Sequence, residues 1–216
     1  MKQQKDFRHA ISAFAAFLLW TAALRYVDVQ PIGPQASAVG FAAMNRFVHK
    51  LTGVHMSLYA VTDWLGLVPL GVAVGFAVLG LAQWIGRKHL RKVDYSILVL
   101  GGFYLVVMGA YILFEVVVVN YRPVLINGFL EASYPSSTTM LVMCVMPTAA
   151  MQLRARIKNR AIKACVTAVI SAFVAFMVLG RLISGVHWIS DIIGGALLST
   201  GLVRMYRGVS SLTNIR

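Results

Sequence analysis

Six long apolar stretches, separated by short polar or basic segments, make up most of the chain. They cover residues 11–27, 64–85, 95–119, 140–153, 164–182 and 186–206. A helix needs about 20 predominantly apolar residues to cross a bilayer, and most of these stretches approach or exceed that length. The stretch at 140–153 is short, so we expect its helix to begin at Ser136. The pattern predicts an all-α, polytopic membrane protein with a bundle of six transmembrane helices.

The connection between the first two stretches, residues 28–63, contains a different pattern. Its apolar residues recur at helical spacing: Phe41, Met44, Phe47, Val48 and Leu51. Polar residues fall largely on the opposite side: Asn45, Arg46, His49 and Lys50. A helix with one apolar and one basic face lies in the membrane interface rather than across it. We therefore expect an interfacial amphipathic helix here, ended at Thr52-Gly53.

The composition agrees with a membrane protein. Of the 216 residues, 59% are hydrophobic and only 12% are charged, whereas about a quarter of the residues of a soluble domain are charged. The net charge of +13 would also suit a nucleic-acid binder, but the basic residues lie in the short segments between apolar stretches. We therefore expect residues 1–216 to form a single transmembrane domain, surrounded by membrane lipids and without a nucleic-acid partner.

The distribution of basic residues predicts the orientation. If the N-terminus is cytoplasmic, 15 of the 20 Lys and Arg residues, Arg216 among them, fall in cytoplasmic segments and 5 on the outer side. Cytoplasmic loops of membrane proteins carry such an excess of positive charge. We expect a multi-pass protein of the cell membrane with both termini, and the loops at 87–92 and 154–163, in the cytoplasm.

Three polar segments then share the outer face: residues 120–123, 135–138 and 180–191. The third contains Arg181, His187 and Asp191, and charged residues at the mouth of a hydrophobic segment are costly enough to indicate a function. If a helix begins near Ser184, His187 and Asp191 lie on one face. The carboxylate can then hold one imidazole nitrogen while the other acts as a nucleophile or base. The alternative is an acidic helix start with an interfacial histidine and a snorkelling arginine.

Together the three segments predict an anion site. Arg122 and Arg181 can neutralise charge on transferring oxygens, and the helix start at Ser136 offers backbone N–H groups to a phosphate. The sequence lacks the carboxylate pairs and the His/Cys spacing of a metal site, so we expect neither a metal nor another cofactor. The chemistry that these residues favour is metal-independent phosphoryl transfer through a phosphohistidine.

The three segments resemble the motifs of the type 2 phosphatidic acid phosphatase (PAP2) superfamily. That family carries Lys-x6-Arg-Pro, Pro-Ser-Gly-His and Ser-Arg-x5-His-x3-Asp. The corresponding segments here are Glu115-x6-Arg122-Pro123, Pro135-Ser136-Ser137-Thr138 and Gly180-Arg181-x5-His187-x3-Asp191. The order of the motifs, their side of the membrane and the six-span layout agree with the family. The resemblance implies a membrane-bound lipid phosphatase with a single PAP2-like domain.

By position, the resemblance implies a role for each matching residue. His187 is similar to the family nucleophile and Asp191 to its orienting carboxylate. The residues similar to phosphate ligands are Arg122, Arg181, Ser136 and Ser137. The chain departs from all three motifs. Ser137 replaces the glycine of the second motif and Gly180 the serine of the third, and two further replacements bear on the chemistry. Glu115 replaces a phosphate-binding lysine and is expected to pair with an arginine, and Thr138 replaces the histidine that protonates the leaving group.

The loss of that histidine bears on the substrate. A lipid monoester leaves as an alkoxide, whose conjugate acid has a pKa of about 16, and it needs a proton from a positioned acid. A lipid diphosphate releases a phosphate monoester, whose second pKa is about 6, and it needs none. We expect hydrolysis of a lipid phosphate or diphosphate at the outer leaflet, with an isoprenoid diphosphate as the best candidate. The alternatives are a lipid phosphotransferase on the same scaffold and a catalytically silent relative that binds anionic lipid.

Overall fold

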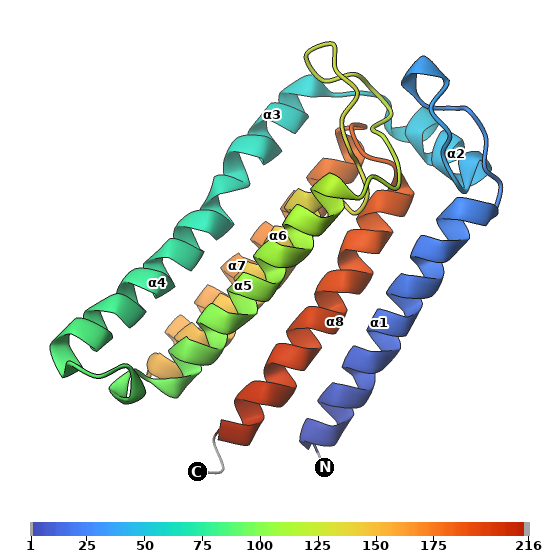
Figure 1. Ribbon diagram of the computed structural model, residues 1–216. Coiled ribbons are helices and arrows are strands. Elements are labelled where there is room, and N and C mark those ends of the chain that lie inside the picture. Colours follow the sequence, from blue (N-terminus) through green and yellow to red (C-terminus); the bar gives the residue numbers. More distant parts are fainter. Residues whose placement is uncertain (1, 214–216) are drawn as a thin grey trace.

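The structure, a computed structural model that describes residues 2–213, is a bundle of long helices (Figure 1). The long helices are α1 (Lys2–Tyr26), α4 (Leu67–Arg87), α5 (Tyr95–Val116), α6 (Ser137–Arg156), α7 (Arg160–Ile183) and α8 (Ile189–Thr213). The connections contain α2 (Ala42–Thr52), α3 (Met56–Leu65) and two 3-10 turns, Pro34–Ala36 and Leu90–Lys92. Residues 2–213 form isolated β-bridges but no strand, so the predicted all-α class is confirmed.

Four helical segments are long and apolar enough to cross a membrane: Gln3–Tyr26, Met56–Arg87, Tyr95–Val116 and Arg160–Ile183. The chain is therefore a multi-pass membrane protein. Helices α6 and α8 coincide with the fourth and sixth predicted spans, but they are less apolar because they pack inside the bundle and carry buried polar residues. Gln152 on α6, for example, donates a 2.6 Å hydrogen bond to the hydroxyl of Tyr206 on α8. Interhelical hydrogen bonds of this kind link neighbouring membrane helices.

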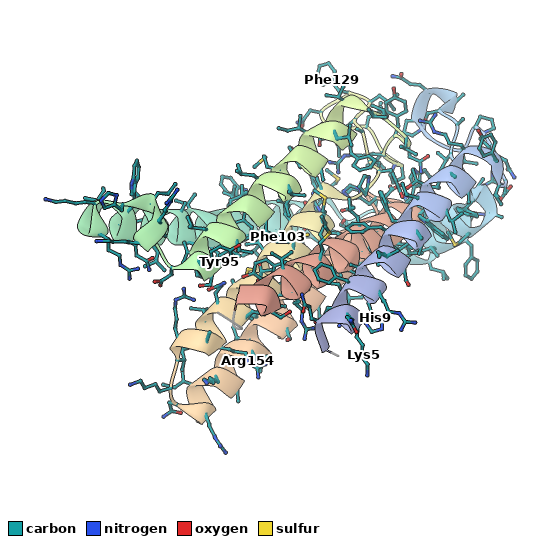
Figure 2. All side chains as sticks on the ribbon, turned by 60° about the horizontal axis from the view of Figure 1, so that its bottom comes forward. Lys5, His9, Tyr95, Phe103, Phe129 and Arg154 are labelled. Atoms are coloured by element: carbon teal, nitrogen blue, oxygen red, sulfur yellow. The ribbon has the colours of Figure 1, made fainter. Side chains whose placement is uncertain are left out.

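The start of α1 and the end of α8 lie at the same end of the bundle. The long loop between α5 and α6 lies at the opposite end (Figure 1). In Figure 2, Lys5, His9 and Arg154 lie at the first end, and Phe129 lies at the second. This arrangement agrees with a polar face opposite the termini. Arg216, one of the basic residues that predict the orientation, lies outside the described residues.

Helix α8 packs along α1 through glycines spaced seven residues apart. A Cβ atom at Gly201 would lie 2.8 Å from the ring of Phe14, and one at Gly208 would lie 3.0 Å from the ring of Phe7. Such distances leave no room for a side chain, so each phenylalanine ring packs directly on the α8 backbone. Small residues allow this close approach of membrane helices.

The connection after α1 has more helix than the sequence predicts. Helix α2 matches the predicted amphipathic segment and ends at Gly53, whose φ of +67° suits glycine. Helix α3 then begins at Met56 and runs into α4 with a break only at Gly66, so the second apolar helix starts eight residues before Trp64. Pro69 lies in the first turn of α4 and lacks the N–H that would bond to Leu65, and the interruption at Gly66 lies just before it.

The segment between α7 and α8 differs from the expected geometry. Helix α7 continues to Ile183, so Arg181 lies in its last turn rather than in a loop. A turn with Gly185 at φ +67° follows, and α8 begins only at Ile189. Asp191 fixes this start because its Oδ2 accepts the backbone N–H of Trp188, the second half of a capping box. His187 therefore precedes the helix and does not share a helical face with Asp191.

Candidate active site

The three predicted polar segments meet at the end of the bundle opposite the termini. The backbone N–H of Ser136 donates to the carbonyl oxygen of Asp191 at 3.1 Å, which joins the second segment to the third. The amide of Asn120 donates to Asp191 Oδ1 at 3.3 Å, which joins the first to the third. The structure thus brings together residues from the ends of α5, α6, α7 and α8.

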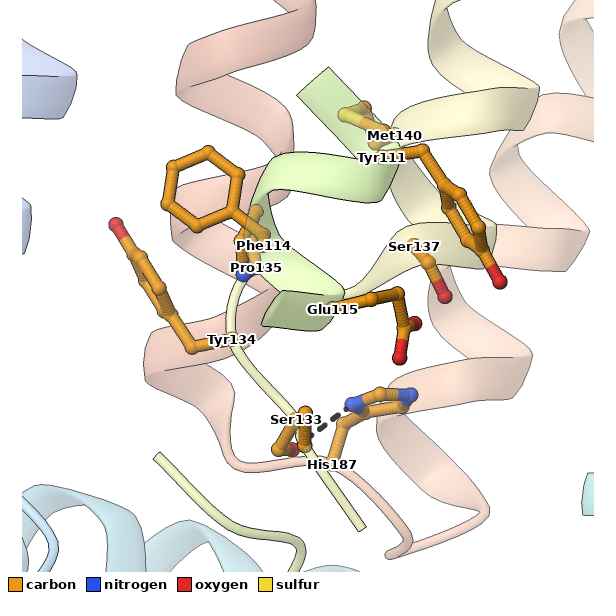
Figure 3. Close-up of a pocket in the computed structure, with 10 residues that line it drawn as sticks. Tyr111, Phe114, Glu115, Ser133, Tyr134, Pro135, Ser137, Met140 and His187 are labelled. Atoms are coloured by element: carbon orange, nitrogen blue, oxygen red, sulfur yellow. Dashed lines mark hydrogen bonds between the residues drawn. The ribbon is translucent and has the colours of Figure 1, made fainter. Parts of the chain in front are cut away.

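His187 is linked to Asp191 through a serine rather than directly. Its Nδ1 lies 3.1 Å from Oγ of Ser133 and 3.9 Å from Oδ2 of Asp191, which is too far for a hydrogen bond (Figure 3). The Ser133 hydroxyl donates its one proton to the Asp191 carboxylate, so it accepts from His187 Nδ1–H. Nε2 of His187 consequently carries the lone pair, which accepts a 3.3 Å hydrogen bond from Arg122. The expected direct contact between histidine and carboxylate is corrected to a three-residue chain.

The Asp191 carboxylate is fully buried and surrounded by donors. Besides Ser133 and Asn120, it accepts the backbone N–H of Trp188 at 2.9 Å and the hydroxyl of Ser190 at 3.4 Å. A buried carboxylate is tolerated when its oxygens are hydrogen-bonded in this way. The carboxylate therefore fixes both the start of α8 and the orientation of the Ser133 hydroxyl.

Burial lowers the pKa of His187 from 6.5 to about 4. The negative charge of Asp191 raises this pKa, whereas the positive charges of Arg122 and Arg181 lower it further. Desolvation is the largest of these effects because the side chain is almost wholly enclosed. At neutral pH the imidazole is thus uncharged, and its Nε2 lone pair is available as a nucleophile.

Arg122 and Arg181 both lie close to the ring of Tyr59, which the sequence does not single out. The guanidinium carbon of Arg122 is 5.8 Å from the ring centroid of Tyr59, and that of Arg181 is 4.8 Å away. Cation–π attraction holds both side chains at this end of α3. Arg122 also donates to Nε2 of His187 at 3.3 Å and forms a 3.0 Å ion pair with Glu131.

Arg181 is buried with part of its hydrogen-bonding capacity unused. Its terminal nitrogens donate to Thr62 at 3.4 Å and to Asp63 at 3.3 Å. Its Nε has no hydrogen-bond partner among the described residues, although the side chain is only 1% exposed. A buried N–H without an acceptor is costly, and an anionic oxygen would satisfy it.

A small pocket opens beside the imidazole (Figure 3). His187, Ser133, Ser137, Tyr111 and Glu115 are among its lining residues, and the Glu115 carboxylate points toward the His187 ring. The expected pairing of Glu115 with an arginine is wrong. Within residues 2–213 Glu115 forms no ion pair, and Arg122 pairs with Glu131 instead.

The remaining residues of the second segment have different surroundings. Ser136 is the N-cap of α6, and its hydroxyl accepts the backbone N–H of Thr139 at 3.5 Å. Ser137 lines the pocket. The methyl group of Thr138 instead faces the junction of α3 and α4, 3.7 Å from where a Cβ at Gly66 would lie. Among the residues of α6, Ser137 and Met140 therefore line the pocket and Thr138 does not.

Sequence reasoning missed four residues of this site: Ser133, Asn120, Glu131 and Tyr59. Ser133 bonds residues 54 and 58 positions later in the chain, a separation at which no periodicity gives a signal. Its only sequence clue is its place two residues before Pro135 in a polar loop. The contacts of Ser133 form only when the loop before α6 folds onto the start of α8.

Comparisons with known proteins agree with this geometry. Residues 114–212 match the family model of the PAP2 superfamily. No curated protein sequence matches the chain. Among solved structures, the chain is similar to the crystal structure of the first transmembrane PAP2 type phosphatidylglycerolphosphate phosphatase, from Bacillus subtilis. The TM-score is 0.56 and the identity 21%, over 94% of this chain and 96% of that one. The resemblance predicted from the three motifs is therefore confirmed by the family-model match over residues 114–212, and the chain has the fold of a PAP2-type membrane protein.

Proposed function

We propose that the protein is a membrane lipid phosphatase that hydrolyses a lipid diphosphate through a phosphohistidine on His187. The observation that carries the proposal is the chain Asp191–Ser133–His187, which leaves the lone pair of His187 on Nε2, hydrogen-bonded to the guanidinium of Arg122 beside the pocket. The similar Bacillus subtilis protein is a phosphatidylglycerolphosphate phosphatase, and this supports a lipid phosphate as the substrate class.

In the first step, Nε2 of His187 attacks the terminal phosphorus and the bond from phosphorus to the leaving oxygen breaks. Without substrate, Arg122 donates a hydrogen bond to Nε2. The substrate phosphate must therefore replace Nε2 as the acceptor of that bond before the attack. Arg181 offers its unpartnered Nε–H. The N–H groups of Ser137 and Thr138 open α6 and have no acceptor within the helix. These donors stabilise the charge on the transferring phosphoryl oxygens without a metal.

The leaving group decides the substrate. No histidine stands at position 138, and Thr138 faces away from the pocket. Tyr134 is no substitute acid, because its hydroxyl lies 2.6 Å from that of Thr21, away from His187. A diphosphate releases a lipid monophosphate, which departs without protonation. We infer that an isoprenoid diphosphate is the preferred substrate.

In the second step, a water molecule attacks the phosphohistidine and the bond between phosphorus and Nε2 breaks. The water proton needs an acceptor, and Glu115 is the carboxylate that faces His187 across the pocket. Glu115 thus acts as the general base of dephosphorylation. This role explains why a carboxylate is compatible with a site for an anion: it acts after the leaving group has gone.

The orientation follows from the charge distribution. The basic loops at 87–92 and 154–163 lie at the end of the bundle that carries the termini, and the pocket lies at the other end (Figure 1). If the basic end is cytoplasmic, the pocket faces the outer leaflet. The substrate would therefore be a lipid whose diphosphate is presented at the outer membrane surface.

Release of free phosphate from matched lipid phosphates and diphosphates, with and without a lipid or sugar acceptor, tests the function. We expect phosphate release from a diphosphate in water, and loss of release in His187→Ala. Chelators should not reduce the rate, and vanadate should inhibit it. Phosphate found on the acceptor instead of in solution would establish a phosphotransferase. Absence of turnover on every substrate, with retained lipid binding, would establish a silent lipid-binding relative.

A further inference from the structure

A second cavity lies away from the catalytic pocket, between α6, α7 and α8. Helices α7 and α8 both pack on α6 and leave a groove of about 940 Å³ between them. Its walls are mainly apolar, and include Met143, Ile170 and Val174. At one end the groove is bounded by Arg154 and Arg207.

A smaller cavity of about 450 Å³ adjoins this end and shares Arg154 and Thr167 with the groove. It adds Arg160 and Lys163 to the basic residues around the opening. No acidic residue lines either cavity. The apolar groove therefore opens at a cluster of four basic side chains. This arrangement is complementary to an anionic lipid, which has an apolar acyl chain and a negatively charged head group.

The four cations are also unneutralised. The side chains of Arg154, Arg160, Lys163 and Arg207 have no hydrogen bond or ion pair with any described residue. Two arginines near the same end differ in this respect: Arg204 pairs with Asp6 at 3.0 Å, and Arg156 lies 4.0 Å from Asp94. The charges of these two arginines are thus partly balanced, whereas those of the four residues at the groove mouth are not.

We propose that this groove binds an anionic phospholipid as a stable ligand, with the phosphate among the four cations and an acyl chain along α6. Basic pockets between membrane helices favour anionic head groups. The site is separate from the catalytic pocket: Ser137 and Arg154 lie about 25 Å apart along α6, at 1.5 Å per residue. A lipid held here does not reach His187, so it is not the substrate of the proposed reaction.

Lipid titration of the purified protein in a zwitterionic detergent tests the site. The probe is phosphatidylglycerol, a phosphodiester without a terminal phosphate, and phosphatidylcholine is its zwitterionic control. We expect phosphatidylglycerol to raise the apparent melting temperature more than phosphatidylcholine does. Arg154→Gln/Arg207→Gln should weaken its binding about 30-fold, because each basic residue near an anionic head group contributes a factor of about five to the affinity.

Two further variants separate a built site from general attraction. Lys88→Gln/Arg91→Gln removes the same charge from an exposed loop at the same end and should leave binding unchanged. Ser171→Phe keeps every charge but fills the groove, and it should also weaken binding. The head group alone, glycerophosphoglycerol, should not stabilise the protein. Equal loss in the two charge variants, or undiminished binding in Ser171→Phe with a native melting temperature, would overturn the proposal.

Discussion

Oγ of Ser133 lies 3.1 Å from Nδ1 of His187 and donates its own proton to the carboxylate of Asp191. The serine comes from the loop before α6, whereas the other two residues flank the start of α8. Asp191 therefore orients the imidazole through an intermediate hydroxyl. Because that hydroxyl gives its proton to Asp191, Nδ1 of His187 keeps its proton and the lone pair is on Nε2.

Ser133→Ala should lower kcat by about 10–100-fold, because a hydrogen bond to a charged group contributes about 1.5–3 kcal/mol. KM should change little, since Ser133 orients the nucleophile and is not among the groups proposed to hold phosphate. Steady-state kinetics on the best lipid diphosphate measure the split. Ser133→Thr keeps the hydroxyl and should recover most of the activity. Unchanged kcat in Ser133→Ala would show that His187 needs no such support.

The low pKa of His187 predicts a dependence of stability on pH. Between pH 6.5 and about 4 the unfolded chain binds a proton that folded His187 does not, so the free energy of unfolding falls as the pH is lowered through this window. A shift of this size corresponds to about 3 kcal/mol. Melting curves in detergent at several pH values should show this loss in wild type but not in His187→Gln. Parallel curves for the two proteins would contradict the burial argument.

The substrate preference should appear as a ratio of catalytic efficiencies. A matched isoprenoid diphosphate should be cleaved with a kcat/KM about 10²–10⁴-fold above that of the monophosphate, the value of a positioned general acid. The two lipids must have the same isoprenoid chain, so that the contribution of the chain to binding cancels in the ratio of the two kcat/KM values. A wild-type enzyme that prefers the monophosphate would show that another group supplies the proton.

Single cysteines test the orientation. Phe129, 72% exposed in the α5–α6 loop, and the exposed Lys158 between α6 and α7 lie at opposite ends of the bundle. In a Cys144→Ala/Cys165→Ser background, an impermeant thiol reagent added to intact cells should label Phe129→Cys and leave Lys158→Cys unlabelled. The reverse result would place the pocket on the cytoplasmic side.

The positions of the long helices could be predicted because length and apolar composition largely determine them. The helical residues before Trp64, by contrast, were missed, because Ser57, Thr62 and Asp63 interrupt the apolar pattern there. The late start of α8 was also missed. It depends on Gly185 and on the cap that Asp191 provides, and both features oppose the continuous apolar pattern around them.

The residues of the candidate site likewise include some that the sequence predicts and some that it does not. His187, Asp191 and the two arginines could be found because their spacing is local and matches a family. Ser133 and Tyr59 could not, because each acts only through a tertiary contact with a distant residue. Glu115 was found at the right place but given the wrong partner, since the sequence does not show that Glu131 lies nearer to Arg122.

The most direct test is to trap the phosphoenzyme in Glu115→Gln. If Glu115 activates the water of the second step, this variant should still cleave a diphosphate labelled in its terminal phosphate. It should then accumulate an acid-labile phosphate on the protein, while wild type releases it. Peptide mapping should place the label on His187, and Glu115→Gln/His187→Ala should carry none. A label on another residue, or turnover without any covalent phosphate in either protein, would contradict catalysis by His187.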